Sequence, residues 1–594
     1  MRLTIVLLFF VSFSFSQTND SQIAYQFYQS GEYEKAIDIY KDLNKGNNSN
    51  SYYYPHFQSL LGIENYKDAK KLVLRISKKN THSLIYLVDL YFVESKLEDK
   101  KSISKILKKI EDEIKKKQSQ LVSVCNSFIK YSFYQEALNL YLIAEKDIPS
   151  NNRDYNIQKA QLYQYMDKDE WMVEEYLSLI EKNPTQKINV INYLQRYLEN
   201  NGIENEENYI LVKNGLLKYS QKEKDTYIFS EILIWLFMQN NDFNLAYLQA
   251  KSLDKRLRED GGRLYDLAET FLDNSYFDLA IKCYQYIIEK GDDNYYYIDA
   301  HVNMLYALGK KEGANLIKID ELYQKIVEEV GVDYTTVLLI YNYAHFKSFS
   351  LNDLPSAQIM LEEAMNMSNI SKTDLAECKL VYADIMLLSS QIWTALLYYS
   401  QVEKDHKESP LGHEAKLRRS KVSYYQGDFE WAQSQLDILK SSTSKLISND
   451  ALHLSLLITD NLNLDTSAVP MEMYARADLL YFQNRFEESI LVLDSIIDIY
   501  SGHTLMDEIY FRKHEIYYKM NNLDQSIEML ETIVSDYAFD ILEDDALFYL
   551  AKIYENDKKD VEKAFYYYET LLMQCSGSIY TSESRKKYRE IRGN

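Results

Sequence analysis

The sequence has little glycine and little proline: its 594 residues include only 16 Gly and 6 Pro. A protein built mainly from strands and tight turns depends on these two residues, so their scarcity argues against a sheet protein. Tryptophan is also scarce, at 4 residues, whereas tyrosine is unusually common, at 54. An array of helix pairs joined by short turns explains this combination, because flat aromatic rings fill the space between stacked helices.

Basic residues are outnumbered by acidic ones. Lys and Arg total 67 against 89 Asp and Glu, which gives a formal net charge of −22 with histidine neutral. Such a surface keeps a long chain soluble and repels polyphosphates. We therefore expect no nucleic-acid partner, because nucleic-acid binding depends on Lys and Arg that neutralise phosphates. The one basic stretch, residues 101–117, contains interleaved acids and is interpreted as a solvated helix face.

Cysteine is rare as well. The 4 cysteines are too far apart in sequence for a metal-knuckle spacing, and we expect all of them to be small buried thiols: Cys125, Cys283, Cys378 and Cys575. The sequence also lacks a P-loop, a G-x-S-x-G elbow and an H-E-x-x-H motif. We therefore expect no enzymatic activity, no cofactor and no metal, although a pair of carboxylates contributed by distant repeats stays open.

The N-terminus has the pattern of a secretory signal peptide. Met1 and Arg2 form a short basic start, an apolar core follows over residues 3–13, and Ser14 and Ser16 suit a cut before Gln17. The apolar core is too short for a retained membrane helix, and no cysteine follows it for lipid anchoring. We expect residues 1–16 to be removed and the protein to be exported, to the periplasm, the outer membrane or the exterior, with no transmembrane segment in the mature chain.

The rest of the chain repeats with a period of about 34 residues. In the clearest copy, residues 261–291, apolar residues recur at helical spacing in two successive segments. Ala268 and Ala280 mark the close approach of these two helices, where a larger side chain would clash. Small residues recur in the same frame along the chain, at Ala36, Ala137, Ala160, Ala246, Ala357, Ala383, Ala432, Ala477 and Ala551.

Small residues at two fixed places, with an aromatic residue between the helices, resemble the tetratricopeptide repeat family over nearly the whole mature chain. The final copy comprises Ala551, Tyr554, Ala564, Tyr568 and Leu571. The resemblance implies an all-α fold, a right-handed superhelical α–α solenoid. Three positions depart from the pattern, because Met172, Ser489 and Ser526 replace the second small alanine.

We divide the mature chain into N-terminal repeats at 17–290, central repeats at 291–441, and C-terminal repeats with a basic terminal helix at 442–594. Within these parts, three segments have apolar residues at helical spacing but match the small-residue positions of the repeat poorly: 186–225, 295–330 and 442–466. They are interpreted as diverged repeats or longer connecting helices. Segments around Gly427 and Gly577 are similar to those of the larger exported tetratricopeptide proteins of bacterial envelopes.

The family resemblance implies that the first helix of each pair lines a concave face. The inward positions carry acidic residues interleaved with aromatic ones, and Lys421 is the only base among them. We expect the following residues to bind a partner: Tyr265, Glu269, Asp384, Lys421, Tyr424, Tyr474, Asp478, Tyr481, Phe511, Glu515 and Tyr518. Exposed tyrosines suit recognition, and residues 377–518 are predicted to form a groove. In the alternative interpretation, the tyrosines pack repeat against repeat and the acids are solvated.

These observations favour a non-catalytic scaffold or adaptor in the cell envelope. Its partner would be a basic or mixed apolar segment of another envelope protein, bound along the concave face. Two other functions stay open. One is a glycan-capture protein of the outer membrane, and the other is a regulatory subunit of a periplasmic enzyme.

Overall fold

The protein is described by a computed structural model. The described residues are 20–593, except 45–50, 117, 148–153, 200–205, 223–226, 312, 442–443, 463–466 and 539–540. The predicted signal peptide, residues 1–16, lies outside them. Every regular element in the described part of the chain is a helix, which confirms the all-α prediction. None of the helices described is both long and apolar enough to cross a membrane.

The chain divides into two compact units, Met1–Arg258 and Glu259–Asn594. Our three-part division of the mature chain stays a prediction. In the first unit a helix covers residues 20–29. It is followed by α2 (Tyr33–Leu43), α3 (Tyr53–Gly62), α4 (Tyr66–Lys79), α5 (Ile85–Lys96), α6 (Lys100–Lys116), η1 (Gln118–Gln120), α7 (Leu121–Lys130), α8 (Tyr134–Asp147), α9 (Asn156–Tyr165), α10 (Asp169–Lys182), η2 (Pro184–Gln186), α11 (Lys187–Leu198), α12 (Glu206–Ser220), α13 (Ile228–Gln239) and α14 (Phe243–Leu257).

The second unit has the same construction. It contains α15 (Gly262–Asp273), α16 (Phe277–Ile288), α17 (Tyr297–Lys310), α18 (Leu316–Val330), α19 (Val337–Ser350), α20 (Leu354–Met365), α21 (Lys372–Leu388), α22 (Ile392–Asp405), α23 (Pro410–Tyr425), α24 (Phe429–Leu439), α25 (Lys445–Leu462), α26 (Val469–Phe482), α27 (Phe486–Ile499), α28 (Met506–Lys519), α29 (Leu523–Asp536), α30 (Glu543–Asn556), α31 (Val561–Gln574) and α32 (Thr581–Arg592).

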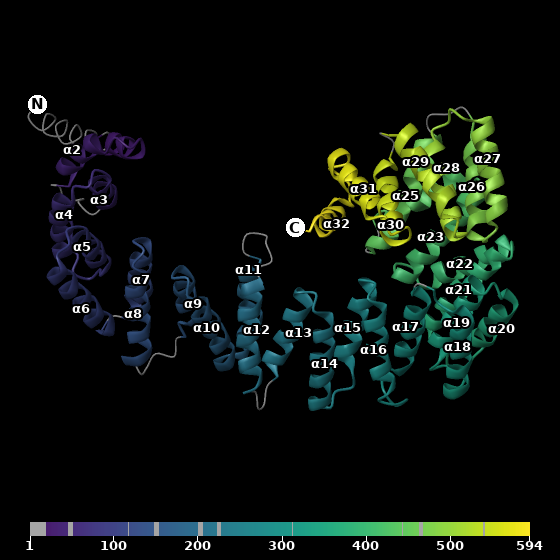
Figure 1. Ribbon diagram of the computed structural model, residues 1–594, viewed down its shortest axis with the longest axis horizontal. Helices are drawn as coiled ribbons and strands as arrows, with labels where there is room; N and C mark the ends of the chain where they lie inside the picture. The colour runs from purple at the N-terminus through teal and green to yellow at the C-terminus, as the bar shows by residue number, and fades with distance from the viewer. Residues whose placement is uncertain are drawn as a thin grey trace, which may run out of the picture. The chain divides into compact units, whose positions relative to one another are not determined.

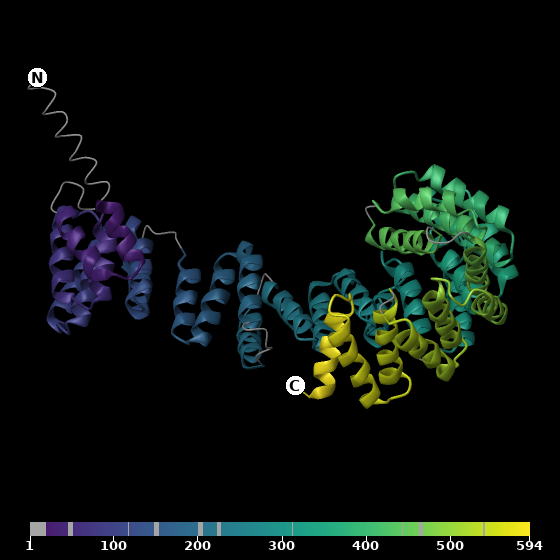
Figure 2. The same ribbon diagram turned by 90° about the horizontal axis from the view of Figure 1, so that it is seen from above.

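Helices within each unit pack mainly against their neighbours in sequence. The closest packing is within pairs such as α21 with α22, α28 with α29 and α30 with α31. Figure 1 shows the helices of each unit following one another in chain order, and Figure 2 shows the same succession from above. Packing that is mainly between neighbours in sequence is the mark of a solenoid. Around α26 the contacts reach further, since α26 packs against α23 and its Phe482 ring meets Phe349 of α19.

The small residues of the repeat lie where the two helices of a pair meet. Ala268 and Ala280 are both fully buried, as the sequence predicted. Both serines that replace alanine in this frame form hydrogen bonds across the helix pair. Ser489 Oγ donates to the carbonyl oxygen of Ala477 at 2.8 Å, and Ser526 Oγ lies 2.8 Å from His514 Nδ1. A serine therefore fits the tight position because its hydroxyl is satisfied there.

The turns within helix pairs explain why so little glycine is needed. Among the described turns within helix pairs, each places one residue in the left-handed region, and most of these residues are not glycine. Asn241, Ser275 and Asn484 have φ values of 57°, 63° and 57°. Asparagine and serine suit turns because their short side chains hydrogen-bond locally, but Glu98 and Lys559, at 57° and 56°, adopt the same conformation.

The helix α25 interrupts the alternation of first and second helices. It lies between the pairs α23/α24 and α26/α27 and packs against α23, α24 and α26, while α23 also contacts α26 directly. The poorly framed stretch 442–466 is therefore a connecting helix rather than a diverged repeat. The other two poorly framed stretches form α11 and α12, and α17 and α18.

Three cysteines are buried as predicted: Cys125, Cys283 and Cys378. The prediction is wrong for Cys575, which caps the C-terminus of α31 and is only partly buried, although it packs against the core there. The basic stretch is the solvated face of α6, whose opposite face buries Ile106, Ile110 and Ile114.

Candidate functional site

Most of the predicted partner-binding residues surround one cavity in the second unit. The cavity has a volume of about 530 Å³ and is lined by α23, α25, α26, α28, the start of α30 and Phe349 of α19. We call it the acidic cavity. Seven predicted residues line it: Lys421, Tyr424, Tyr474, Asp478, Tyr481, Phe511 and Glu515. They come from three helix pairs, and the connecting helix α25 supplies a further wall.

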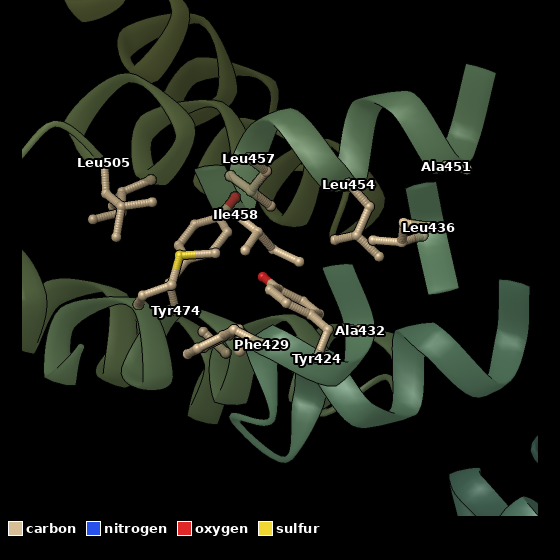
Figure 3. Close-up of a cluster of buried hydrophobic side chains, with 14 of the residues drawn as sticks. Tyr424, Phe429, Ala432, Leu436, Ala451, Leu454, Leu457, Ile458, Tyr474 and Leu505 are labelled. Atoms are coloured by element: carbon tan, nitrogen blue, oxygen red, sulfur yellow. The ribbon is translucent and has the colours of Figure 1, made fainter. Parts of the chain in front are cut away.

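The floor of the acidic cavity is built from tyrosines that belong to the core. Tyr424 and Tyr474 are only 1% and 3% exposed, and Figure 3 shows the Tyr424 side chain pointing into a cluster that includes Leu457 and Ile458 of α25. The Tyr474 hydroxyl donates to the carbonyl oxygen of Glu508 at 3.3 Å. The expectation of exposed tyrosines is therefore wrong for these two residues, which pack repeat against repeat, as in the alternative interpretation.

Asp478 is held by charged and polar neighbours rather than by solvent. Tyr424 Oη donates to Asp478 Oδ2 at 2.9 Å, and Arg512 Nε lies 2.8 Å from Asp478 Oδ1. Arg512 also pairs with Glu515 and lies over the Tyr481 ring, 4.7 Å from its centroid. Burial raises the pKa of Asp478, while the Arg512 guanidinium opposes that rise.

Lys421 is thus not the only base on this face. Arg512 and Lys519 also line the acidic cavity. The sequence frame missed Arg512 because it follows the inward position of Phe511 by one residue, yet its long side chain reaches back to Asp478. The signal that could have found it is the spacing of about 34 residues between an acid and the arginine in the next repeat.

A similar arrangement of an acid and an arginine occurs two helix pairs earlier in the solenoid. Asp384 is 7% exposed and accepts a hydrogen bond from Tyr399 Oη at 2.5 Å. Arg418 Nη1 lies 2.5 Å from Asp384 Oδ2, and Arg418 Nε lies 2.8 Å from Glu414 Oε1. Asp384 does not line the acidic cavity; it holds two neighbouring helix pairs together.

The predicted residues of α15 form a separate polar cluster. Glu269 Oε1 accepts hydrogen bonds from Tyr284 Oη at 2.5 Å and from Asn303 Nδ2 at 3.0 Å. Asn303 Nδ2 also donates to Tyr265 Oη at 3.0 Å, and the Tyr265 ring stacks on Tyr296. The structure therefore does not bring Tyr265 and Glu269 into the acidic cavity.

Three carboxyl groups in the acidic cavity have no Lys or Arg partner among the described residues: Asp460, Glu508 and Asp545. Burial, with the adjacent Asp507 carboxyl, raises the pKa of Glu508 to about 9. Glu508 Oε1 accepts a hydrogen bond from Asn461 Nδ2 at 3.2 Å, and its Oε2 is buried without a hydrogen-bond partner. Asp545 accepts a hydrogen bond from Tyr580 Oη at 2.7 Å, and burial raises its pKa.

A second pocket, of about 270 Å³, adjoins the acidic cavity and contains the predicted residue Tyr518. We call it the aromatic pocket. Five aromatic or imidazole rings line it: Tyr481, Phe511, His514, Tyr518 and Tyr549. Charged side chains at its rim are Glu515, Lys519, Lys552 and Asp557. Burial lowers the pKa of His514 to about 4, so this ring is neutral near pH 7. Tyr481, Phe511, Glu515 and Lys519 belong to both the aromatic pocket and the acidic cavity.

This arrangement is suited to holding a ligand. Asp478 and Glu515 are both held in place by ion pairs with Arg512. Within the described part of the chain, no group of three or more His, Cys, Asp or Glu side chains is placed to hold a metal ion. A cavity with apolar walls and a few polar groups is the usual form of a binding site.

Comparison with known proteins identifies one repeat by sequence. A tetratricopeptide repeat family model matches residues 545–572, which include the whole final copy of the predicted frame, from Ala551 to Leu571. All five residues of that copy are buried. No curated protein sequence matches the chain significantly.

Solved helical structures resemble the chain only loosely. The Naa15/Naa10 complex with HypK-THB matches at 13% identity over 97% of this chain and 96% of that chain, with a TM-score of 0.29. Yeast Tom70 matches at 12% identity over 93% and 98%, with a TM-score of 0.26. A tetratricopeptide repeat protein from Parabacteroides merdae matches at 10% identity over 46% and 91%, with a TM-score of 0.25. Functional reasoning therefore rests on the geometry of the site.

Proposed function

We propose that the chain is a non-catalytic scaffold that binds a segment of another protein in the acidic cavity and the adjoining aromatic pocket. One observation carries this proposal: predicted binding residues from three helix pairs surround a single cavity that α25 helps to enclose. A volume of about 530 Å³ falls in the usual range for ligand sites, roughly 300–1,000 Å³. Several side chains of a peptide segment fit in such a space.

The chemistry of the cavity favours a basic or mixed apolar segment. Its lining combines the carboxyl groups of Asp460 and Asp545 with the side chains of Leu456, Ile541 and Phe511. Leu456 and Ile541 are 44% and 68% exposed, so apolar contact area is available to a partner. Glycan capture is less well supported, because stacking on a sugar needs free aromatic faces and the rings of Tyr424 and Tyr474 are committed to the core.

The cell envelope is the proposed location, supported by the signal-peptide pattern of residues 1–16. The partner would then be another envelope protein. The mass of the mature protein purified from the envelope fraction tests the export step. We expect the chain to begin at Gln17; a chain that retains residues 1–16 and fractionates with the cytoplasm would contradict export.

Site-specific photo-crosslinking in native cells tests the binding function. A photoreactive amino acid at Leu456, in the cavity wall, should give a discrete cross-linked product. The matched control places it at Leu491, which is 66% exposed on α27 and lines neither pocket. Equal products from both positions, or none from Leu456, would contradict a partner bound in the cavity.

A further inference from the structure

We infer that the bound segment inserts a basic side chain, Lys or Arg, into the acidic cavity and an aromatic or large aliphatic side chain, two or three residues away, into the aromatic pocket. This inference rests on the proposed function and specifies the recognition motif of the partner. It depends on three features of the second unit: unbalanced charge in the acidic cavity, a cluster of aromatic rings in the aromatic pocket, and a wall shared by the two pockets.

The unbalanced charge comes from three helices that face the same space. Asp460 lies on α25, Glu508 on α28 and Asp545 on α30, and none forms an ion pair with Lys or Arg in the described part of the chain. The bases of the cavity are otherwise engaged: Lys421 lies 3.5 Å from Asp450, and Arg512 is paired with Asp478 and Glu515.

The other two cationic groups do not balance these carboxyls. Lys519 lies over the Tyr481 ring, 4.1 Å from its centroid, and forms no ion pair in the described structure. The exposed His453 of α25 lies near enough to Asp545 for its charged form to lower the pKa of that carboxyl. Burial raises the pKa of Glu508 and of Asp545, because buried carboxyls without a counterion favour their protonated forms. An entering ammonium or guanidinium group would stabilise the charged forms of these two carboxyls and release protons from them.

The aromatic pocket has a different character. The Phe511 ring centroid lies 5.8 Å from that of Tyr549, and the His514 centroid lies 5.7 Å from that of Tyr549. His514 is neutral near pH 7, and its Nδ1 is occupied by Ser526 Oγ. An apolar side chain that displaces water from these rings gains free energy in proportion to the apolar area buried.

The shared wall sets the spacing of the motif. Tyr481, Phe511 and Glu515 contribute to both pockets, so the two sites follow one another across α28. Packed helices are about 8–10 Å apart, and an extended chain advances about 3.3 Å per residue. Side chains two or three residues apart in an extended segment therefore reach the two sites together.

Binding of synthetic peptides to the full mature chain tests this inference. The peptides carry one Arg and one Phe separated by zero to six residues, in both orders, on a Gly/Ser background. We expect the tightest binding at separations of two or three residues, with a loss of about tenfold or more when Arg is replaced by neutral citrulline or Phe by Ala. Calorimetry in buffers of different ionisation enthalpy should detect proton release with the Arg peptide near pH 8 and not with the citrulline peptide.

Protein variants assign each side chain to its site. D460N combined with D545N should remove the preference for Arg over citrulline but keep the preference for Phe. Y549A should remove the preference for Phe over Ala but keep the preference for Arg over citrulline. D273N, an exposed change at the end of α15 outside both pockets, is the matched control, and circular dichroism checks that each variant keeps its helix content.

The possible failures are distinguishable. If peptides bind with no dependence on Arg, on spacing or on the two aspartates, or if none binds, the two-site motif is overturned. A discrete cross-link from Leu456 to a native partner would in that case still support the proposed function. Loss of the Leu456 cross-link would contradict both.

Discussion

Hydrogen bonds between tyrosine hydroxyls and carboxylates recur along the chain and link two features of its composition, abundant tyrosine and excess acid. Tyr399 donates to Asp384, and both Tyr53 and Tyr131 donate to the buried Asp89 at 2.6 Å. A hydrogen bond to a charged group contributes about 1.5–3 kcal/mol when it is buried. These tyrosines therefore fill space between helices and also satisfy acids that would otherwise be costly to bury.

Removing one buried hydroxyl should reveal this contribution. We expect Tyr399→Phe to lower the free energy of unfolding by about 1–3 kcal/mol, because Asp384 loses a donor in a buried site. The matched change Tyr567→Phe, whose hydroxyl donates to Glu531 at an exposed site, should cost less than about 0.5 kcal/mol. Urea denaturation followed by circular dichroism compares the two. Equal losses would show that burial does not set the strength of these bonds.

Glu508 should make stability depend on pH. Its pKa rises from 4.5 to about 9 on folding, so between these values the folded state holds a proton that the unfolded state has released. The contribution of this proton to the free energy of unfolding is fully present below pH 4.5. It decreases as pH rises toward 9, by up to about 1.4 kcal/mol per pH unit.

Glu508→Gln cannot titrate and should become progressively more stable than the wild type as pH rises from 5 to 9. Denaturation midpoints measured across this range test the expectation, with Glu528→Gln on the exposed face of α29 as the control. A stability difference that does not vary with pH would show that Glu508 is ionised in the folded protein.

At the scale of residues, the sequence predicts well which small residues lie where two helices meet, and predicts poorly which ion pairs form between helices. Ala268 and Ala280 are recognisable because only small residues fit where helices meet. The pairing of Arg512 with Asp478 is not recognisable from a helix-face pattern, because it depends on how far a flexible side chain reaches toward another helix. The burial of Tyr424 and Tyr474 depends on α25, whose position no repeat pattern predicts.

At the scale of elements, the helix pairs can be predicted from the sequence, whereas the position of the connecting helix α25 cannot. The 34-residue frame predicts pairs because each repeats the same contacts with its neighbours. The stretch that forms α25 has apolar residues at helical spacing but lacks a partner helix in the frame. Its place against α23, α24 and α26 results from tertiary packing, and this packing creates the acidic cavity.

The turns within helix pairs give a prediction at the same scale. Glu98 is exposed and adopts a φ of 57°, a conformation that costs a non-glycine residue about 1–2 kcal/mol. Glu98→Gly should change the free energy of unfolding by less than about 1 kcal/mol, in the stabilising direction, because relief of strain exceeds the added chain entropy. Glu98→Val should lower it by about 1–2 kcal/mol, since β-branched residues tolerate this region least. Thermal unfolding of the two variants tests the order; a more stable valine variant would contradict the turn geometry.

At the scale of the whole molecule, the two compact units suggest where the chain can be divided. A fragment of residues 259–594 retains every residue of the acidic cavity and the aromatic pocket. We expect it to fold and to bind the partner as the full chain does. A fragment of residues 291–594 lacks α15 and α16 and exposes the face of α17 that packs closely against α16. Its thermal midpoint should be lower, and equal midpoints would place the natural boundary near residue 290 instead.

Hydrogen exchange of the full chain, with and without the cross-linked partner protein, tests the central claim most directly. The claim is that a partner segment lies in the cavity enclosed by α25 and the neighbouring first helices. Protection should then concentrate in α25, in α28 and at the start of α30, and leave the second helices α27 and α29 unchanged. Protection confined to α27 and α29, or no protection in the second unit, would contradict it.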